Sequence, residues 1–490
     1  MSSNITTLLF GLLPFVKAYL MSNLSRVRRD GLIANRIPNR GRAALVTYAV
    51  ALCTILAPGT GAAAWKARVL GKGFGGSVAV TPDGTTHLVY VKGRAGLVHL
   101  QFAPTGRLLA KETVNGPDGA YATAPAIAAD SKGRIHLAYR DSVGAAGVPI
   151  IYGLLENGVW SFQSIDTGVN SLAIAVDSHD HPHLVYNDIH AWFDGSLWHK
   201  ELVPGLAPLF TLSLAVGTDD SVHIAFDHRE GGNDSVCHAV KTSDSWNVDQ
   251  CFSGGLFPSI ALDQENRPRL AFGGENNAGA HYVEFDGAQW TDTLLSAEGT
   301  SATVNIDAAN DPRILLTTVE RRRTLAVYLH RFEGTWFGRA LGSAPSLSLG
   351  SLDLDPAGFP HGTLSASGAM SPFVQVYAFE TGADLTPAGL TIANSSQGLQ
   401  AQLTVANRGS AAGSGFKASF FVSDDATLSP DDTPLKTLNI SAPAGKQRTF
   451  SFKFQPDGSV SGKFLIAQIT SKHPEAEGNT TNNVASVQIP

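Results

Sequence analysis

One short pattern recurs seven times in this chain and limits its fold more than any other feature. The copies are SVAVTPDGTTHLVYV (77–91), PAIAADSKGRIHLAYRD (125–141), LAIAVDSHDHPHLVYND (172–188), LSLAVGTDDSVHIAFDH (212–228), PSIALDQENRPRLAFGG (258–274), ATVNIDAANDPRILLTT (302–318) and SLDLDPAGFPHGTLSAS (351–367). The position of His87 is held in the later copies by His136, His183, His223, Arg269, Arg313 and His361, at steps of 49, 47, 40, 46, 44 and 48 residues. A period in the forties with several strands per unit is typical of β-propeller blades. The sequence therefore predicts an all-β, seven-bladed propeller.

Each unit contains the pattern of four strands. Short runs rich in Val, Ile and Ala flank an Asp/Asn/Gly turn, which indicates an antiparallel hairpin, and segments such as 148–166 and 280–296 supply a third and a fourth strand. The turn between the outer strands is followed by a Trp at 160, 198, 246, 290 and 336, whereas the first unit has Arg107-Leu108 there. We expect these rings to fill the widening gap between blades at the rim.

The seventh unit has only three strands of its own, which end near Tyr377. WKARVLGKG (65–73) matches the fourth-strand pattern WFGRALGSA (336–344). We therefore expect the N-terminal strand to complete the last blade, which would leave no unpaired edge in the ring.

Residues 1–64 have the pattern of a signal or targeting segment. An apolar run at 43–58 follows three Arg residues, and Ala62-Ala63-Ala64 offers a cleavage site before Trp65. For the earlier apolar stretch, 6–20, we favour a translation-start artefact over an additional membrane anchor. The predicted location is secreted, either extracellular or at the cell surface, with the periplasm as an alternative and no membrane span after signal removal.

The net charge restricts the kinds of binding partner, and the cysteines indicate a disulfide-bonded hairpin. The chain has a formal net charge of −6 and becomes more acidic without residues 1–64, so nucleic acid is excluded as a partner. Cys237 and Cys251 lie symmetrically about Asp244. A hairpin centred there places the two cysteines opposite each other, with Thr242 opposite Trp246, and predicts a disulfide.

After residue 380 the repeat stops, and 383–490 contains six or seven alternating strands typical of an immunoglobulin-like sandwich. The segments NRGSAAG, FFVSDDATLSPDDTPL and HPEAEGNTTNNVASVQI resemble the CARDB domain, a cell-adhesion-related module of bacterial and archaeal surface proteins. The repeats at 65–380 resemble secreted bacterial propellers that share the sialidase-type architecture. They lack the Ser-x-Asp-x-Gly-x-Thr-Trp box, so the resemblance implies no sialidase site.

Residues that recur in every unit are expected to be structural. We assign the repeated His, and the Asp at 130, 177, 263, 307 and 355, to hydrogen bonds around the turn between the first two strands. Polar residues that do not recur, at the far end of the second strand, are better ligand-binding candidates. They are Arg140, Asp141, Asn187, Asp188, His190, Asp227, His228, Arg229, Glu275, Asn276, Glu320 and Arg321.

This face allows two functional interpretations. As a binding site it would hold a carbohydrate or protein ligand with these residues and with Tyr139, Tyr186 and Trp192, in an adhesion-type role. As a polysaccharide lyase, it would neutralise a uronate with Arg140 or Arg229 and move a proton with His190, His228 or Tyr186. Paired carboxylates such as Asp188 and Asp227 would instead suit a glycoside hydrolase. Binding is favoured because no nucleophile motif is present.

No cofactor is required by either interpretation. Four carboxylates in one acidic loop of the C-terminal domain suit a calcium ion, although their spacing is not that of an EF-hand. They are Asp424, Asp425, Asp431 and Asp432. A plain solvated loop is the alternative.

Overall fold

The computed structural model describes residues 64–490 except 94–95, 115–121, 142–147, 169–170, 207–210, 231–232, 243–244, 275–277, 369–372, 397, 456–457, 459 and 473–476. The predicted signal segment lies outside these residues apart from Ala64. The described chain is all-β, as the sequence predicts, and contains no α-helix. In particular, none of its described segments is a helix long and apolar enough for a membrane span.

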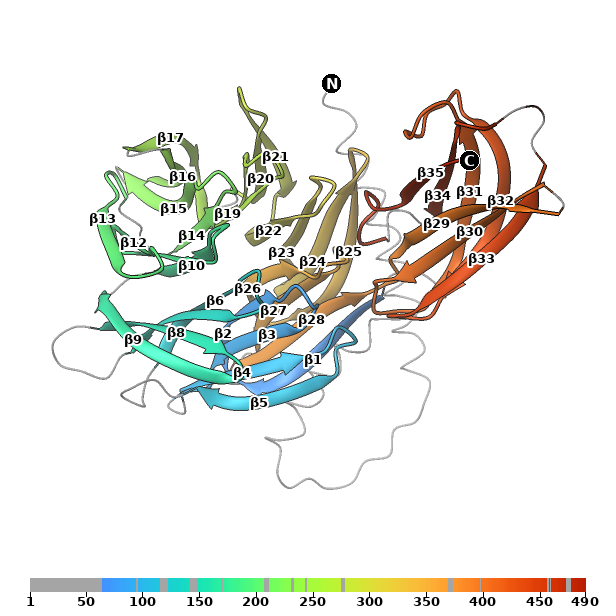
Figure 1. Ribbon diagram of the computed structural model, residues 1–490. Helices are drawn as coiled ribbons and strands as arrows, with labels where there is room; N and C mark the ends of the chain where they lie inside the picture. The colour runs from blue at the N-terminus through green and yellow to red at the C-terminus, as the bar shows by residue number, and fades with distance from the viewer. Residues whose placement is uncertain are drawn as a thin grey trace, which may run out of the picture. The chain divides into compact units, whose positions relative to one another are not determined.

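Seven four-stranded antiparallel sheets within the described residues form the blades (Figure 1). Blade 1 is β2 (Phe74–Val80), β3 (Thr86–Val91), β4 (Leu97–Phe102) and β5 (Leu108–Val114); blade 2 is β6 (Ala122–Ala129), β7 (Ile135–Asp141), β8 (Pro149–Glu156) and β9 (Val159–Thr167). Blade 3 is β10 (Leu172–Val176), β11 (Pro182–Tyr186), β12 (Ile189–Phe193) and β13 (Trp198–Leu202); blade 4 is β14 (Leu212–Val216), β15 (Val222–Glu230), β16 (Asn233–Thr242) and β17 (Ser245–Ser253). Blade 5 is β18 (Gly255–Leu262), β19 (Pro268–Gly274), β20 (Ala280–Phe285) and β21 (Trp290–Ser296); blade 6 is β22 (Gly299–Ile306), β23 (Pro312–Glu320), β24 (Arg323–Phe332) and β25 (Thr335–Ala344). Blade 7 is β26 (Ser346–Leu354), β27 (Pro360–Ser367), β28 (Val374–Thr381) and β1 (Ala64–Lys72).

The first strands of the blades form a closed ring. β2 contacts β6, and the contacts continue through β10, β14, β18, β22 and β26 back to β2. Serine side chains join neighbouring strands of this ring, because Ser77, Ser213 and Ser259 accept hydrogen bonds from the backbone N–H groups of Ile127, Ile260 and Val304 in the next blade (3.1–3.2 Å). Ser351 closes the series by accepting from Val78 (2.7 Å).

The N-terminal strand completes the last blade, as predicted. β1 pairs antiparallel with β28, with Trp65 opposite Glu380 and Lys72 opposite Val374. Trp65 is 2% exposed and packs on Tyr328 of blade 6, with ring centroids 4.8 Å apart. The edge of β28 is therefore paired and buried.

Each blade contributes an aromatic side chain that packs on a His or Tyr side chain from the third strand of the preceding blade. Trp160, Trp198, Trp246, Trp290 and Trp336 contact His99, Tyr152, His190, His238 and Tyr282, with ring centroids 5.1–5.6 Å apart. In blade 1, where the sequence lacks this Trp, Phe102 stacks on Tyr377 at 4.7 Å. The predicted role of the Trp residues between blades is confirmed.

The disulfide Cys237–Cys251 joins β16 and β17, as predicted, but the register of the surrounding hairpin differs from the prediction. Thr242 pairs with Ser245, and Trp246 lies opposite Lys241. A register shift between His238 and Ala239 restores the pairing of the two cysteines. The symmetric spacing of two cysteines does not reveal a bulge. The sequence therefore predicted the disulfide correctly but the register of the hairpin around the turn incorrectly.

The C-terminal region is a two-sheet sandwich, as predicted. One sheet is β29 (Leu385–Ser395), β30 (Gly398–Asn407) and β33 (Gln447–Phe454), and the other is β32 (Thr433–Ala442), β31 (Gly413–Ser423), β34 (Phe464–Ser471) and β35 (Val484–Gln488). Buried residues of both sheets, such as Leu403, Phe420 and Leu465, form one hydrophobic core.

Candidate functional site

The turn between the first and second strands of a blade, here called the inner turn, is built around one carboxylate. In blade 2, Asp130 Oδ1 accepts hydrogen bonds from the backbone N–H groups of Lys132 (3.0 Å) and Arg134 (2.8 Å). Asp177, Asp263, Asp307 and Asp355 accept the same pair of bonds in blades 3, 5, 6 and 7. The repeated Asp residues therefore cap inner turns, and they place the next side chains on one end of the propeller.

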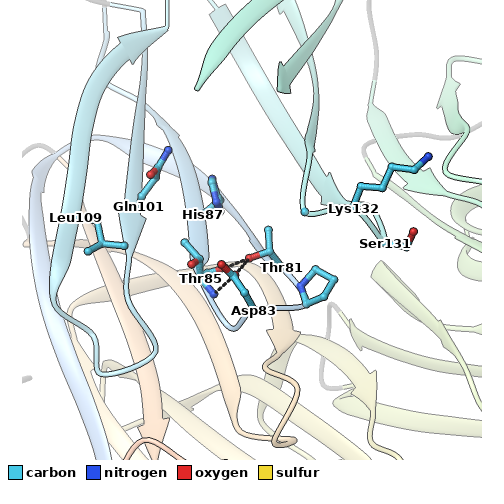
Figure 2. Close-up of a pocket in the computed structure, with 10 residues that line it drawn as sticks. Thr81, Asp83, Thr85, His87, Gln101, Leu109, Ser131 and Lys132 are labelled. Atoms are coloured by element: carbon cyan, nitrogen blue, oxygen red, sulfur yellow. Dashed lines mark hydrogen bonds between the residues drawn. The ribbon is translucent and has the colours of Figure 1, made fainter. Parts of the chain in front are cut away.

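A polar cavity of about 410 Å³ lies on this end, between the inner turns of blades 1 and 2 (Figure 2). Its lining comes from the inner turn of blade 1 (Thr81, Pro82, Asp83, Thr85), the start of β3 (His87), the outer strands of blade 1 (Gln101, Leu109) and the inner turn of blade 2 (Ser131, Lys132, Gly133). Figure 2 shows Thr81, Asp83 and Thr85 grouped on one side and Ser131 and Lys132 on the other.

The side of the cavity formed by blade 1 is held rigid by its own turn. Asp83 Oδ1 accepts hydrogen bonds from Thr81 Oγ1 (2.6 Å) and from the backbone N–H of Thr85 (2.9 Å). These bonds, the one from Thr81 above all, hold the pKa of Asp83 below its usual value, so the carboxylate is charged at neutral pH. The cavity therefore combines this anion with the ammonium of Lys132, which also pairs with Asp180 (2.9 Å).

His87 lines the cavity and is the first member of a chain of polar side chains that runs from two buried imidazoles to an exposed carboxylate. His87 Nδ1 lies 2.9 Å from His99 Nε2, and Glu112 Oε1 accepts a hydrogen bond from His99 Nδ1 (2.7 Å). Trp160 Nε1 donates to the same Glu112 oxygen (3.0 Å). Burial, together with the neighbouring His99, lowers the pKa of His87 to about 3, so this ring is neutral and weakly basic.

The same chain recurs in blades 3 and 4. His183 contacts His190 (3.0 Å), which donates to Glu201 (2.9 Å), and His223 contacts His238 (3.1 Å), which donates to Asp249 (2.6 Å). In the other blades the third-strand residue is a Tyr, as in the contacts of His136 with Tyr152 (2.7 Å) and His361 with Tyr377 (2.6 Å). A contact of this kind in six of the seven blades makes these chains part of the blade structure. His136 Nε2 also reaches the turn carboxylate of Asp130 (3.2 Å), as expected for the repeated His.

A second cavity, of about 320 Å³, adjoins the first and lies nearer the ring of first strands. Val80, Ala129 and Leu354 line it at the ends of β2, β6 and β26, together with residues of the inner turns of blades 1, 2 and 7. Thr81, Pro82 and Ser131 belong to both cavities. The inner-turn end of blades 7, 1 and 2 therefore offers the hollow surface that a small polar ligand requires.

The binding candidates chosen from the sequence lie at the opposite ends of the second strands. Arg140 and Asp141 end β7, and Asp141 is buried. Asn187 and Asp188 form the turn between β11 and β12, while Glu320 and Arg321 lie at the exposed turn between β23 and β24. Arg229 is partly exposed and donates to Asp234. Glu275 and Asn276 fall outside the described residues. His228 is half-buried near the end of β15 and contacts Phe226.

Besides Asp141, two of these candidates are interior groups, which the sequence did not reveal. His190 is 1% exposed, and both ring nitrogens are used by His183 and Glu201. Asp227 is fully buried and accepts bonds from the backbone N–H and the hydroxyl of Thr211. His190 lies within β12 and Asp227 within β15, and the bonds described above engage the atoms that each side chain would offer to a ligand.

Two of the three aromatic candidates are also interior, and the third, Trp192, is partly buried. Tyr139 and Tyr186 are buried, and Tyr186 donates to Asp166 (3.0 Å). Trp192 stacks on His190 and His199, with Lys241 Nζ 4.9 Å from its ring centroid. These rings stabilise blades 2 and 3 and do not form the open platform on which a sugar would stack.

The acidic loop proposed for calcium uses its carboxylates locally. Asp425 accepts from the backbone of Thr427 (2.7 Å), Asp432 accepts from that of Ser429 (2.7 Å), and Asp424 pairs with Lys463 (2.7 Å). Asp431 is exposed. Within the described residues, the one group of three potential metal ligands is Asp177, His179 and Asp220, in the inner turns of blades 3 and 4.

Comparison with known proteins identifies the C-terminal region. The CARDB family model matches residues 382–487. This part of the chain is a CARDB domain. The CARDB domain spans β29 to almost the end of β35 and confirms the resemblance carried by its sequence motifs. Among curated proteins, none matches the chain.

Several solved structures are weakly similar to the chain. AofleA from Arthrobotrys oligospora aligns with a TM-score of 0.41 and 12% identity over 60% of this chain and 94% of its own. A polysaccharide lyase, PL25 ulvan lyase, gives 0.42 and 11% over 63% and 94%, and the Aleuria aurantia lectin in complex with alpha-methyl-L-fucoside gives 0.37 and 12% over 52% and 90%. The propeller assignment rests instead on the sheets and contacts described above.

The residues that form the cavity were missed by reasoning from the sequence. Thr81, Asp83 and Lys132 belong to inner turns, which the repeat marks as structural. One sequence feature could have indicated the cavity: the first repeat unit differs from the others in the residue at one third-strand position. By strand register, Gln101 occupies in blade 1 the position of Leu154 in blade 2 and Trp192 in blade 3.

Proposed function

We propose that this protein is a secreted or cell-surface binding protein whose propeller holds a carbohydrate at the inner-turn cavity of blades 1 and 2. The observation that supports this is the composition of the cavity: an anion (Asp83), hydroxyls (Thr81, Ser131), an amide (Gln101), an imidazole (His87) and an ammonium (Lys132) around about 410 Å³. Donors and acceptors in such a mixture suit a ligand with many hydroxyl groups, and Pro82 and Leu109 offer small apolar surfaces to a sugar ring.

The CARDB domain supports an adhesion-type role for the whole chain. Modules of this class occur outside the cell, and the disulfide between Cys237 and Cys251 is compatible with an oxidising compartment. We infer that the propeller provides ligand recognition and that the CARDB domain provides attachment or spacing. A protein ligand is the alternative partner for the same face.

A polysaccharide-active enzyme is the second candidate function, because His87 reaches the cavity with His99 and Glu112 behind it. A catalytic base works best with a pKa near the operating pH. Burial and the neighbouring His99 leave His87 with a pKa of about 3, too weak a base to remove a sugar proton efficiently. Since blades 3 and 4 contain the same chain, binding is the function that the geometry supports better.

The proposal is tested by glycan-array binding followed by titration calorimetry on the full chain. Gln101→Trp gives blade 1 the residue that blade 3 has at this position, so it fills the cavity with a side chain that the fold accepts. We expect at least tenfold weaker glycan binding by Gln101→Trp and by Gln101→Ala.

A matched control separates this site from the loop end of the strands. Arg229→Ala combined with Arg321→Ala alters the site proposed from the sequence and should leave glycan affinity within twofold. If that double variant loses glycan binding and Gln101→Trp does not, the glycan binds at the ends of the second strands opposite the inner turns, and the proposed site is wrong. Time-dependent cleavage of uronate polymers that His87→Ala abolishes would establish the enzyme instead.

A further inference from the structure

The inner turns of blades 3 and 4 bring together three side chains that can bind a metal. Asp177 and His179 belong to the turn of blade 3 and Asp220 to that of blade 4. One potential ligand atom from each of the three lies within 4.8 Å of the other two. His179 and Asp220 are exposed, so the group is open to solvent.

The backbone explains why these three groups meet. Asp177 Oδ1 accepts from the N–H groups of His179 (2.9 Å) and His181 (2.7 Å), which fixes the carboxylate, while Oδ2 faces the side chains of His181 and His183. Asp220 adopts a left-handed backbone conformation (φ 61°) at a position whose side chain reaches the preceding blade elsewhere in the ring. Its counterparts Asp180, Asn266 and Asn310 accept from the N–H groups of Ser131, Thr218 and Gln264 (2.8–2.9 Å).

The separation of His179 and Asp220 matches shared metal coordination better than hydrogen bonding. His179 Nδ1 lies 3.6 Å from Asp220 Oδ1, beyond a normal hydrogen bond, with Ser178 Oγ 3.3–3.4 Å from both atoms. Asp177 offers a carboxylate oxygen within 4.8 Å of the other two ligand atoms, and its Oδ2 also lies 3.4 Å from His181 Nδ1 and 3.6 Å from His183 Nε2, two imidazoles outside the group. Two ligands bound tetrahedrally to one zinc ion lie about 3.4 Å apart, given metal–ligand distances near 2.0–2.1 Å.

The equivalent inner-turn positions between blades 2 and 3 carry two permanent cations that blades 3 and 4 lack. Lys132, the counterpart of His179, pairs with Asp180, the counterpart of Asp220 (2.9 Å). Arg134, the counterpart of His181, pairs with Asp130. Two carboxylates there face two permanent cations. Between blades 3 and 4 both cations are replaced by imidazoles, so the carboxylates of Asp177 and Asp220 have no permanent positive charge from these positions.

We propose that a divalent first-row transition metal, of which zinc is the type, supplies this charge by binding Asp177, His179 and Asp220. An imidazole nitrogen with two carboxylate oxygens suits such an ion, whereas Ca²⁺ and Mg²⁺ prefer oxygen ligands alone. The remaining coordination positions face solvent and hold water. The ion ties the inner turn of blade 3 to that of blade 4, as the Lys132–Asp180 pair ties those of blades 2 and 3.

The test is calorimetric titration of the untagged full chain with Zn²⁺, and with Ca²⁺ and Mg²⁺ for comparison. We expect one Zn²⁺ per chain and at least tenfold weaker binding in His179→Ala and Asp220→Asn. His179→Lys is the matched variant, since it copies Lys132 of blade 2. It should abolish Zn²⁺ binding and keep the melting temperature of the parent.

His199→Ala is the control for exposed histidines. His199 pairs with Asp194 (2.6 Å) outside this group, so its removal should leave Zn²⁺ affinity unchanged. The proposal is overturned if Zn²⁺ does not bind at millimolar concentration, or if it binds equally to the parent and to all three site variants. Binding of Ca²⁺ that depends on Asp220 but not on His179 would also overturn it, because the imidazole would then play no part.

Discussion

Single residues in this propeller are held by chains of polar side chains that cross the blades. In six blades the second-strand His or Arg contacts a His or Tyr of the third strand, whereas Arg269 of blade 5 pairs with Glu284. In blades 1, 3 and 4 a fourth-strand carboxylate nearer the surface ends the chain. Buried polar groups stabilise a fold only when they are hydrogen-bonded, and these chains satisfy that condition in the neutral state of their histidines. The polar chains therefore make stability depend on pH.

Stability should fall as the pH decreases from about 6.5 toward 4. Burial lowers the pKa of His87 to about 3 and of His183 and His223 to about 4, whereas a histidine of the unfolded chain has a pKa of about 6.5. Below pH 6.5 the unfolded chain binds protons that the folded chain does not, so each of these histidines destabilises the fold by about 2–3 kcal/mol at pH 4.5. Urea unfolding at pH 7.5, 6.0 and 4.5 measures the slope, which His223→Gln should reduce.

His281 supplies a control of opposite sign. A hydrogen bond to Asp292 raises its pKa, so its contribution is present at low pH and is lost as the pH rises through the raised value. His281→Gln should therefore steepen the decline between pH 7.5 and 4.5. Equal stability of the parent at pH 7.5 and 4.5 would show that the buried histidines titrate normally.

The structural role of these residues was predictable because they recur, but their partners were not. Recurrence placed His136 beside its turn, and nothing in the sequence showed that position 152 of the third strand would complete the pair. Non-recurring residues were less informative. His190 was chosen as a ligand-binding candidate because it does not recur and follows the far end of the second strand, and yet strand β12 begins at Ile189 and buries it.

At the scale of the elements, aromatic rings connect one blade to the next. Trp246 packs on His190 of blade 3 and donates from Nε1 to Glu201 (3.0 Å), so it contacts the last two members of the polar chain His183–His190–Glu201. Trp198 packs on Tyr152 in the same way, but its buried Nε1 has no hydrogen-bond partner among the described residues. The two tryptophans therefore share a packing role and differ in one hydrogen bond.

Replacing each of these tryptophans by Phe should separate packing from hydrogen bonding. Both substitutions shrink the ring equally, but only Trp246→Phe removes a bond to a charged acceptor. We expect Trp246→Phe to cost about 1.5 kcal/mol more than Trp198→Phe, the lower end of the 1.5–3 kcal/mol typical of bonds to charged groups. Chemical denaturation measures both. Equal losses would mean that the bond to Glu201 contributes nothing to stability.

Strand order within a blade follows from the sequence, and the exact register does not. Alternation and turn residues identified the hairpins, including the one that carries Cys237 and Cys251. The bulge near His238 adds a residue to β17, which places Asp249 within 2.6 Å of His238. Bulges arise from side-chain packing and polar pairing between strands, which local sequence patterns do not show.

At the scale of the whole molecule, the ring depends on a pairing between its two ends. β1 and β28 are separated by about 300 residues in sequence, as the bond from Thr381 Oγ1 to Ala64 O (3.0 Å) shows. This closure was predictable because WKARVLGKG repeats the fourth-strand pattern of blade 6. The inner-turn cavity was not, since it depends on which side chains of two different blades leave space between them.

Removing β1 should open the ring. Deletion of residues 1–72 exposes the edge of β28 and removes Trp65 from its contact with Tyr328, so the chain should aggregate or lose cooperative unfolding. Deletion of residues 1–63 is the matched control, because it leaves β1 intact and should keep the parent melting curve. Trp65→Ala should have an intermediate stability, because truncating a buried Trp is expected to cost about 3–5 kcal/mol. Thermal melts and size-exclusion chromatography measure all three. If the 1–72 deletion unfolds at the temperature of its control as a monomer, blade 7 is stable with three strands, and β1 does not close the propeller.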